Sequence, residues 1–349
     1  MSFIQHSSPH AHGSNSTQKV MLTVALATLP GLVAMVLFFG IGPLINVMLC
    51  VGFCVGFEAL ALALRKRPIG FYLRDYSALV TGVLLGLALP PYCPWWLLLV
   101  GAFFAIVVAK QLYGGLGFNP FNPAMVGYVV LLISFPVAMT QWAAPTGVGD
   151  HSLPGLAAAL SQVFSGQGAD GYSGATPLDA FKQAQGLTVD AIYEQPLFSA
   201  GHIAGAGWEW VNLGFLIGGL FLLWRGIFSW HAPAAMLLAI SLLAFIFFDG
   251  SSESGGSPLL HLFSGATMLG AFFIVTDPVS SAVSKKGRLI YGAGIGALVY
   301  VIRTWGNYPD AVAFSVLLMN FAAPFIDYYT LPRTYGHTRP RRATEKADN

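Results

Sequence analysis

Long apolar runs separated by short polar stretches make up almost the whole chain. An α-helix needs about 20 mostly apolar residues to cross a hydrocarbon core about 30 Å thick, so these runs predict membrane helices. The third, fourth, sixth and ninth runs are short for a full crossing, and we expect half-helices or tilted helices there. The pattern predicts an all-α polytopic membrane protein with about ten transmembrane segments: Val20–Phe39, Leu44–Leu64, Ser77–Leu89, Trp95–Ala109, Ala124–Trp142, Trp210–Trp224, Ala232–Phe248, Leu260–Val275, Leu289–Ile302 and Asp310–Thr330.

The composition indicates that lipid is the main solvent of this chain. Of its 349 residues, 55% are hydrophobic and 9% are charged, and the mean hydropathy is +0.66. A soluble domain has about 25% charged residues, far more than this chain has to cover its surface. The composition therefore excludes a water-soluble globular protein. The first 19 residues are polar and contain no cleavable signal peptide, so we expect them to remain as a cytoplasmic tail.

The positions of lysine and arginine set the expected orientation, because these residues concentrate in cytoplasmic loops. With the N-terminus inside, fifteen of the 17 basic residues lie on the cytoplasmic side, and only Lys182 and Arg303 lie outside. Both termini are then cytoplasmic. The long polar stretch 143–209 becomes an extracytoplasmic segment.

The two apolar halves resemble each other weakly. DYSALVTGVLLGLALPP (Asp75–Pro91) aligns with LFSGATMLGAFFIVTDP (Leu262–Pro278), and FNPA (Phe121–Ala124) aligns with YPDA (Tyr308–Ala311) at the same spacing. Each half then holds five segments, and an odd number places the halves in opposite orientations, as in the inverted repeats of transporters. Chance similarity between apolar helices is the alternative.

These observations divide the chain into five parts. A cytoplasmic N-terminal tail (1–19) precedes membrane repeat 1 (20–142), and the extracytoplasmic segment (143–209) precedes membrane repeat 2 (210–330). A basic cytoplasmic tail (331–349) follows, and its charge is explained by the cytoplasmic bias and by contact with anionic lipid. We expect no nucleic-acid partner.

The sharpest chemical signal is the sequence DGYSGAT (Asp170–Thr176) in the extracytoplasmic segment. It resembles the flavinylation motif of the Rnf complex, found in its D subunit, and of a related protein, the B subunit of the sodium-pumping NADH:quinone oxidoreductase. GGLGFNPFNPA (Gly114–Ala124) and TDPVSS (Thr276–Ser281) also resemble sequences of this family. The likeness therefore covers most of the chain, and the total length and short N-terminal arm are more similar to the Rnf protein.

The resemblance implies a covalent cofactor. In that family a periplasmic flavin transferase esterifies FMN to the last threonine of the motif, which is Thr176 here. Asp170 and Ser173 match the recognition positions, and Gly174 and Ala175 complete the cofactor-binding motif. A second, noncovalent riboflavin in the membrane part is also expected from the related proteins.

The same resemblance implies the cellular role. The chain would be a redox subunit, not a stand-alone catalyst, in a six-subunit Rnf-type complex of the bacterial inner membrane. It would relay electrons between ferredoxin- and NADH-linked partners through its FMN, coupled to the translocation of Na⁺ or H⁺. The other subunits, the flavin transferase and membrane lipid are then its expected partners.

Thr176 also has a purely structural interpretation. The sequence Thr-Pro-Leu-Asp from Thr176 to Asp179 is typical of a helix start, with threonine as the N-cap and proline at the first helical position. The two interpretations are compatible, because the N-cap oxygen can also carry the flavin.

The tetrapeptide Ser264–Thr267 repeats SGAT inside the eighth apolar segment, with His261 where the motif has aspartate. We expect no flavin on Thr267, because a water-borne transferase cannot reach lipid depth. Gly265 and Ala266 are typical of close helix packing. A wall of the noncovalent flavin pocket is the functional alternative.

Ionisable residues at membrane depth are candidates for an ion path. Glu58 lies in the middle of the second segment, and Asp277 lies at the cytoplasmic end of the eighth. A hydrogen bond to a neighbouring helix, or a protonated carboxyl group, is the alternative for Glu58. Pairing with Lys285 and Lys286 is the alternative for Asp277.

Two further groups have more than one interpretation. Asn119 and Asn122 suit either a polar cavity or simple turns. Cys50 and Cys54 share a helix face and are expected to be small buried side chains, with a shared iron–sulfur ligand set as the alternative. Cys93 has no assigned role, and the sequence contains no metal-binding motif.

An inverted-repeat solute channel or transporter without a redox cofactor is the competing function. The extracytoplasmic segment separates the two hypotheses, because a bare channel has no need of DGYSGAT. A membrane scaffold for partner subunits is a third possibility, and it predicts no flavin.

Overall fold

The computed structural model describes residues 16–148, 153–166, 173–184, 186–201, 203–250, 256–306, 308 and 310–330. Both predicted tails lie largely outside these ranges, and so does Asp170. Within them the chain is mostly helical, as the apolar pattern predicts. Three helical stretches are long and apolar enough to cross a membrane by themselves, namely Thr17–Phe39, Gly42–Leu64 and Val312–Thr330. Several shorter apolar helices accompany them, in agreement with a polytopic membrane protein.

The first half of the bundle follows the predicted segments closely. A local bend at Thr28 divides the first segment into two helices, and the fourth segment changes from α- to π-helical geometry after Phe103. The elements are α1 (Thr17–Ala27), α2 (Leu29–Phe39), α3 (Gly42–Leu64), α4 (Ile69–Leu73), α5 (Ser77–Ala88), α6 (Trp95–Phe103), the π-helix η1 (Phe104–Gln111), α7 (Pro123–Ser134) and α8 (Pro136–Thr140).

The middle segment is a layer of short elements with one two-stranded sheet. Strand β1 pairs antiparallel with β2, so that Trp142 lies opposite Gly174 and Ala143 opposite Ser173. The elements are β1 (Trp142–Ala143), α9 (Leu156–Ser165), β2 (Ser173–Gly174), α10 (Pro177–Gln183), α11 (Val189–Tyr193) and α12 (Pro196–Ser199).

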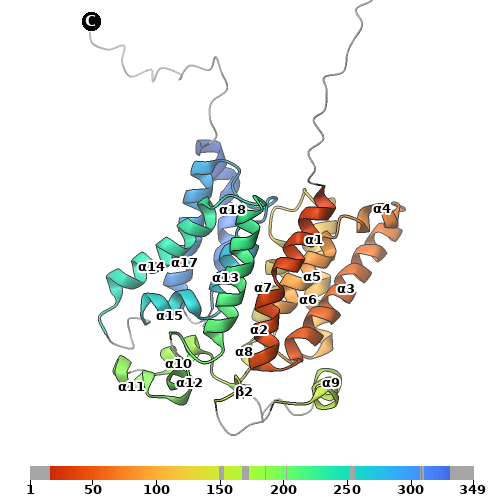
Figure 1. The fold of residues 1–349 in the computed structure, drawn as a ribbon. Helices are drawn as coiled ribbons and strands as arrows, with labels where there is room; N and C mark the ends of the chain where they lie inside the picture. Colours follow the sequence, from red (N-terminus) through yellow and green to blue (C-terminus); the bar gives the residue numbers. More distant parts are fainter. Residues whose placement is uncertain are drawn as a thin grey trace, which may run out of the picture.

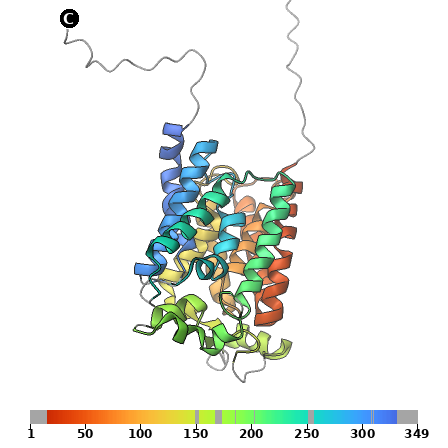
Figure 2. The same ribbon diagram turned by 60° about the vertical axis from the view of Figure 1, so that its left-hand side comes forward.

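The second half forms another group of packed helices. Its elements are α13 (Trp208–Trp224), α14 (His231–Phe247), α15 (Pro258–Phe263), α16 (Thr267–Leu269), the π-helix η4 (Gly270–Ile274), α17 (Lys285–Trp305) and α18 (Val312–Thr330). Figure 1 shows the two halves side by side. Helix α1 begins and α18 ends at one end of the bundle, which we call the terminal end. Helices α9 to α12 cover the opposite end, which we call the segment end, and Figure 2 shows the same arrangement from another side.

Glycine lets the helices of each half approach closely. A Cβ atom on Gly82 of α5 would lie 2.6 Å from the Cα atom of Val51 in α3, and one on Gly86 would lie 2.6 Å from the Cα atom of Val47. The backbones therefore touch, as is common where membrane helices pack through small residues.

Three predicted segments differ from the structure. The fifth helix ends at Ser134 because Phe135 precedes Pro136 and leaves the helical region, with φ −134° and ψ 56°. The ninth, predicted to be short, is a 21-residue helix that begins four residues earlier, at Lys285. The eighth is not continuous, because the chain breaks between α15 and α16 at Gly265, which has φ +58°.

Candidate functional site

Thr176 has the local structure that the sequence predicts. It is the N-cap of α10, with Pro177 at the first helical position, and its hydroxyl oxygen accepts a hydrogen bond from the backbone N–H of Asp179 at 3.2 Å. The same hydroxyl donates to the Asp179 carboxylate at 2.6 Å. Ser173 and Ala175 are exposed and Gly174 is half-buried, whereas Thr176 is only 8% exposed. Thr176 therefore points into the protein.

Helix α10 is fixed against the second half of the bundle. The Lys182 ammonium group donates to the carbonyl oxygen of Tyr308 at 3.0 Å. Phe181 is buried in a small cluster with Phe198 and Leu260, of which Leu260 belongs to α15. These contacts hold the N-terminal end of α10, and with it Thr176, over the bundle.

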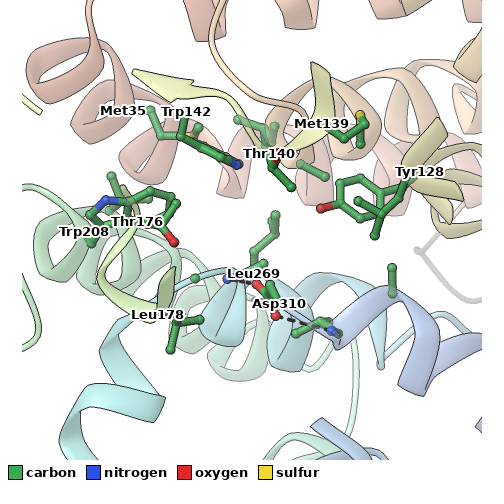
Figure 3. A pocket seen from close by; sticks show the side chains of 18 of the residues that line it. Met35, Tyr128, Met139, Thr140, Trp142, Thr176, Leu178, Trp208, Leu269 and Asp310 are labelled. Carbon is green, nitrogen blue, oxygen red and sulfur yellow. Dashed lines mark hydrogen bonds between the residues drawn. The ribbon is translucent and has the colours of Figure 1, made fainter. Parts of the chain in front are cut away.

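Thr176 lies in the wall of a cavity at the segment end, which we call the segment cavity (Figure 3). The cavity offers about 80 Å³ to the centres of water molecules, several times the 10–15 Å³ or so that one water molecule requires. Both halves of the bundle and the middle segment line it. Its apolar lining includes Met35, Phe39, Leu87, Met125, Leu132, Met139, Trp142, Leu178, Trp208, Phe215, Leu269 and Val312.

One wall of the segment cavity is aromatic. The rings of Trp142 and Trp208 have centroids 4.9 Å apart and are tilted by 56°. Phe39 meets the Trp208 ring edge-on at 5.2 Å. Trp142 comes from β1, and its pairing with β2 brings it close to the motif that ends at Thr176. The wall can therefore pack against a flat aromatic ligand.

The opposite wall carries acidic groups. Asp310 accepts hydrogen bonds from the backbone N–H groups of Ala266 at 2.7 Å and Ala311 at 2.8 Å, and it pairs with Arg303 at 3.0 Å. Tyr128 points its hydroxyl group into the cavity (Figure 3). Burial raises the pKa of Asp179, and the hydrogen bond from Thr176 opposes this rise.

The second SGAT sequence forms part of this cavity. The Asn212 side chain donates hydrogen bonds to the carbonyl oxygens of Phe263 and Gly265, at 3.0 and 3.1 Å. These bonds replace hydrogen bonds that the backbone lacks at the break in the helix. Gly265 and Ala266 line the cavity at the break between α15 and α16. Gly265 also lies in close contact with its surroundings, because a Cβ atom there would be 2.6 Å from an Asp310 oxygen. Thr267 is fully buried, and its hydroxyl donates to the carbonyl oxygen of His261 at 2.7 Å.

A second cavity, the terminal cavity, opens toward the other end of the bundle. Its polar lining is Ser77, Thr81, Lys110, Asn119, Asn122, Thr276 and Asp277. Asp277 accepts hydrogen bonds from the Ser280 hydroxyl at 2.8 Å and the Val279 backbone at 3.1 Å, with the Asn122 amide at 3.4 Å. The carboxylate thus turns toward the bundle, and its partners are not the lysines at 285 and 286.

Glu58 belongs to a buried ion pair. The Lys110 ammonium group lies 2.7 and 2.8 Å from its two carboxylate oxygens, and both residues are 2% exposed. Lys110 also donates to the Ser77 hydroxyl at 2.6 Å, which in turn donates to Asp75 at 2.6 Å. A hydrogen-bonded chain therefore runs from Glu58 to Asp75. Lys110 connects Glu58 to the terminal cavity that Asp277 also lines.

Comparison with known proteins identifies the family. The model of the NQR2, RnfD, RnfE family matches residues 4–336. This chain belongs to the NQR2/RnfD/RnfE family. The match covers both halves of the bundle and the segment that carries Thr176.

Individual members of the NQR2/RnfD/RnfE family are similar over their full length. A protein of Cellvibrio japonicus, named as the D subunit of an ion-translocating oxidoreductase complex, is 65% identical over 349 residues, 99% of this chain and 98% of its own. Proteins of the same name from Ectopseudomonas mendocina and Alcanivorax borkumensis are 60% and 57% identical, over 95% and 99% of this chain and 96% and 100% of theirs.

Sequence reasoning misses three features of the two cavities in this family member. The charge distribution places Lys110 on the cytoplasmic side and Arg303 on the outer side, yet both are buried in ion pairs. The partners lie 52 residues apart in the first case, so no local pattern predicts the pair. The aromatic wall is missed as well, because Phe39, Trp142 and Trp208 come from three separate elements.

Proposed function

We propose that this chain is the D subunit of a Rnf-type ion-translocating electron-transport complex, with FMN esterified to Thr176. The names of the full-length relatives support the complex. The sequence DGYSGAT supports the attachment. One structural observation carries the cofactor part of the proposal: Thr176 lies in the wall of a cavity with aromatic side chains at its edge.

The residues of the segment cavity fit a tethered flavin. Trp142 and Trp208 offer aromatic faces to a flat ring system, and most of the other lining residues are apolar. Gly265 lets the chain lie close to Asp310 in the wall of this cavity, since a Cβ on Gly265 would lie 2.6 Å from an Asp310 oxygen. When bound, FMN would supply the electron-accepting and electron-donating chemistry. The protein holds the ring and shields it.

For a noncovalent riboflavin we propose the terminal cavity. The Asn119 side-chain oxygen is buried there without a hydrogen-bond partner among the described residues, and Asn122 and Asp277 add further polar groups. A neutral ligand with hydrogen-bond donors at its edge would satisfy Asn119. A buried unpaired oxygen otherwise costs about 1–3 kcal/mol.

The membrane arrangement is part of the same proposal. Ten segments form two inverted repeats of five, both termini face the cytoplasm of a bacterial inner membrane, and the segment end faces outward. The fifteen-to-two distribution of basic residues supports this orientation. Alkaline phosphatase should be active when fused near Gln185 and inactive when fused after Asn349. The reverse pattern would contradict the topology.

Ion translocation, of Na⁺ or H⁺, is proposed to involve Glu58 and Asp277. Both oxygens of Glu58 are occupied by Lys110, so an ion can bind there only when Lys110 moves away. Asp277 lines a cavity and is better placed for direct contact. The remaining subunits would supply the other redox centres, because a 30 Å or so hydrocarbon core is too thick for one flavin to bridge.

The test is the fluorescence of the denatured protein under ultraviolet light, after expression with an active flavin transferase. The wild type and Thr267→Ala should both fluoresce, and Thr176→Ala should be dark while still inserting in the membrane. Thr267→Ala is the matched control, because it makes the same change in the second SGAT sequence, at the break between α15 and α16. A wild-type Thr176 peptide of unmodified mass would refute the proposal and leave the cofactor-free transporter.

A further inference from the structure

Asp179 stands out among the acidic groups around the segment cavity because its hydrogen bonding depends on Thr176. Its carboxylate accepts a hydrogen bond from the Thr176 hydroxyl at 2.6 Å, and the Thr176 backbone N–H also favours its charged form. Asp310 is different: it accepts from two backbone N–H groups within 2.8 Å and pairs with Arg303. The partners of Asp310 therefore do not depend on Thr176, whereas Asp179 has the Thr176 hydroxyl as a partner.

Attachment of a phosphate group at Thr176 would change the surroundings of Asp179 in two ways. An esterified oxygen carries no proton, so the donor to Asp179 is lost. A phosphodiester also brings a negative charge to the same oxygen. Both changes disfavour the carboxylate form, since hydrogen bonding stabilises a charged group and a nearby like charge destabilises it.

The remaining groups around Asp179 act in opposite directions. Burial already raises its pKa, Asp310 adds to the rise, and the Lys182 ammonium group lowers it. The charge of Arg303 is paired with that of Asp310, and Tyr128 is uncharged in its ordinary state. After loss of the hydrogen bond from the Thr176 hydroxyl, the Thr176 backbone N–H and the Lys182 ammonium group remain to favour the ionised form.

We propose that Asp179 takes up a proton from the outer aqueous side when the flavin on Thr176 is reduced and releases it when the flavin is oxidised. This inference rests on the proposed function. The electron that enters the flavin adds negative charge to the cavity, and one O–H bond forms on the Asp179 carboxylate to compensate it. No other bond forms or breaks, and the electron comes from the redox partner that the complex supplies.

The experiment measures the reduction potential of the covalent flavin against pH, from pH 5 to 9, in purified protein. In the wild type the potential should fall with rising pH by up to ~59 mV per unit, the value for one proton per electron. Asp179→Asn should make this dependence less steep, because only proton uptake by the flavin ring itself then remains. Its potential should equal that of the wild type at low pH and exceed it at high pH, where the wild type has a carboxylate beside the flavin.

A second variant keeps the test decisive if Asp179→Asn is poorly flavinylated. Lys182→Gln removes the cation that favours ionised Asp179, so the pH range of falling potential should move upward. Glu194→Gln, at an exposed site after α11, is the matched control and should leave the curve unchanged. An infrared difference spectrum should also show a protonated carboxyl group on reduction that is missing in Asp179→Asn.

The outcomes separate this inference from the proposed function. A wild-type protein without covalent flavin would refute the proposed function. A normally flavinylated Asp179→Asn protein with the wild-type pH dependence would refute proton uptake by Asp179 and would leave the proposed function intact. An unshifted curve in Lys182→Gln would count against it in the same way.

Discussion

The two cavities lie at opposite ends of one bundle, and their walls differ in chemistry. The segment cavity combines aromatic rings with a buried threonine hydroxyl, whereas the terminal cavity is lined by amides, hydroxyl groups, a lysine and a carboxyl group. The segment cavity suits a planar group held by a covalent tether. The terminal cavity suits a ligand or ion held by hydrogen bonds and charge. One chain can therefore treat the two sides of a membrane differently.

The largest effect is expected near the terminal cavity. Glu58→Ala leaves the Lys110 ammonium group buried without its counter-charge, and breaking a buried ion pair costs about 3–5 kcal/mol. The double variant Glu58→Leu with Lys110→Met should recover most of this loss. Thermal unfolding in detergent measures both. An unchanged unfolding temperature in Glu58→Ala would mean that Lys110 finds another partner or loses its charge.

A smaller effect is expected at the aromatic wall of the segment cavity. Trp142→Leu should lower the free energy of unfolding by about 1 kcal/mol, because the ring contact with Trp208 is lost. It should also increase the fluorescence of the covalent flavin in the folded protein, because an adjacent indole ring quenches it. Trp96→Leu, whose ring meets Phe135 away from this cavity, is the control for loss of an aromatic pair. Equal flavin fluorescence in both variants would show that Trp142 does not lie beside the flavin.

The smallest effect on stability is expected for Asp277→Asn. An asparagine oxygen can still accept hydrogen bonds from the Ser280 hydroxyl and the backbone N–H of Val279. The free energy of unfolding should therefore change by less than about 1 kcal/mol. Ion transport per electron in the assembled complex should nevertheless fall, and covalent flavin should remain complete. Unchanged transport would remove Asp277 from the proposed ion path.

The parts that could be predicted from the sequence are those encoded locally. Helix positions follow from apolar runs, and the N-cap at Thr176 follows from four consecutive residues. The parts that could not be predicted depend on distant partners. Gly265 belongs to an apolar run that predicts a continuous helix, and the structure breaks the helix there because Asn212 and Asp310 satisfy the exposed backbone groups. Hydrogen bonds from other helices of this kind cannot be predicted from the residues next to Gly265 in the sequence.

The burial of Thr176 has a consequence for the proposed attachment of a flavin, because it constrains the order of attachment and folding. A threonine that is 8% exposed and points into a cavity is out of reach of another enzyme's active site. If Thr176 carries the proposed flavin, the proposed transferase has to act while the middle segment is still detached from the bundle, or during an opening that breaks the contact of Lys182 with Tyr308. Attachment first and closure second would then function as a checkpoint, since closure of the segment seals in whatever Thr176 carries.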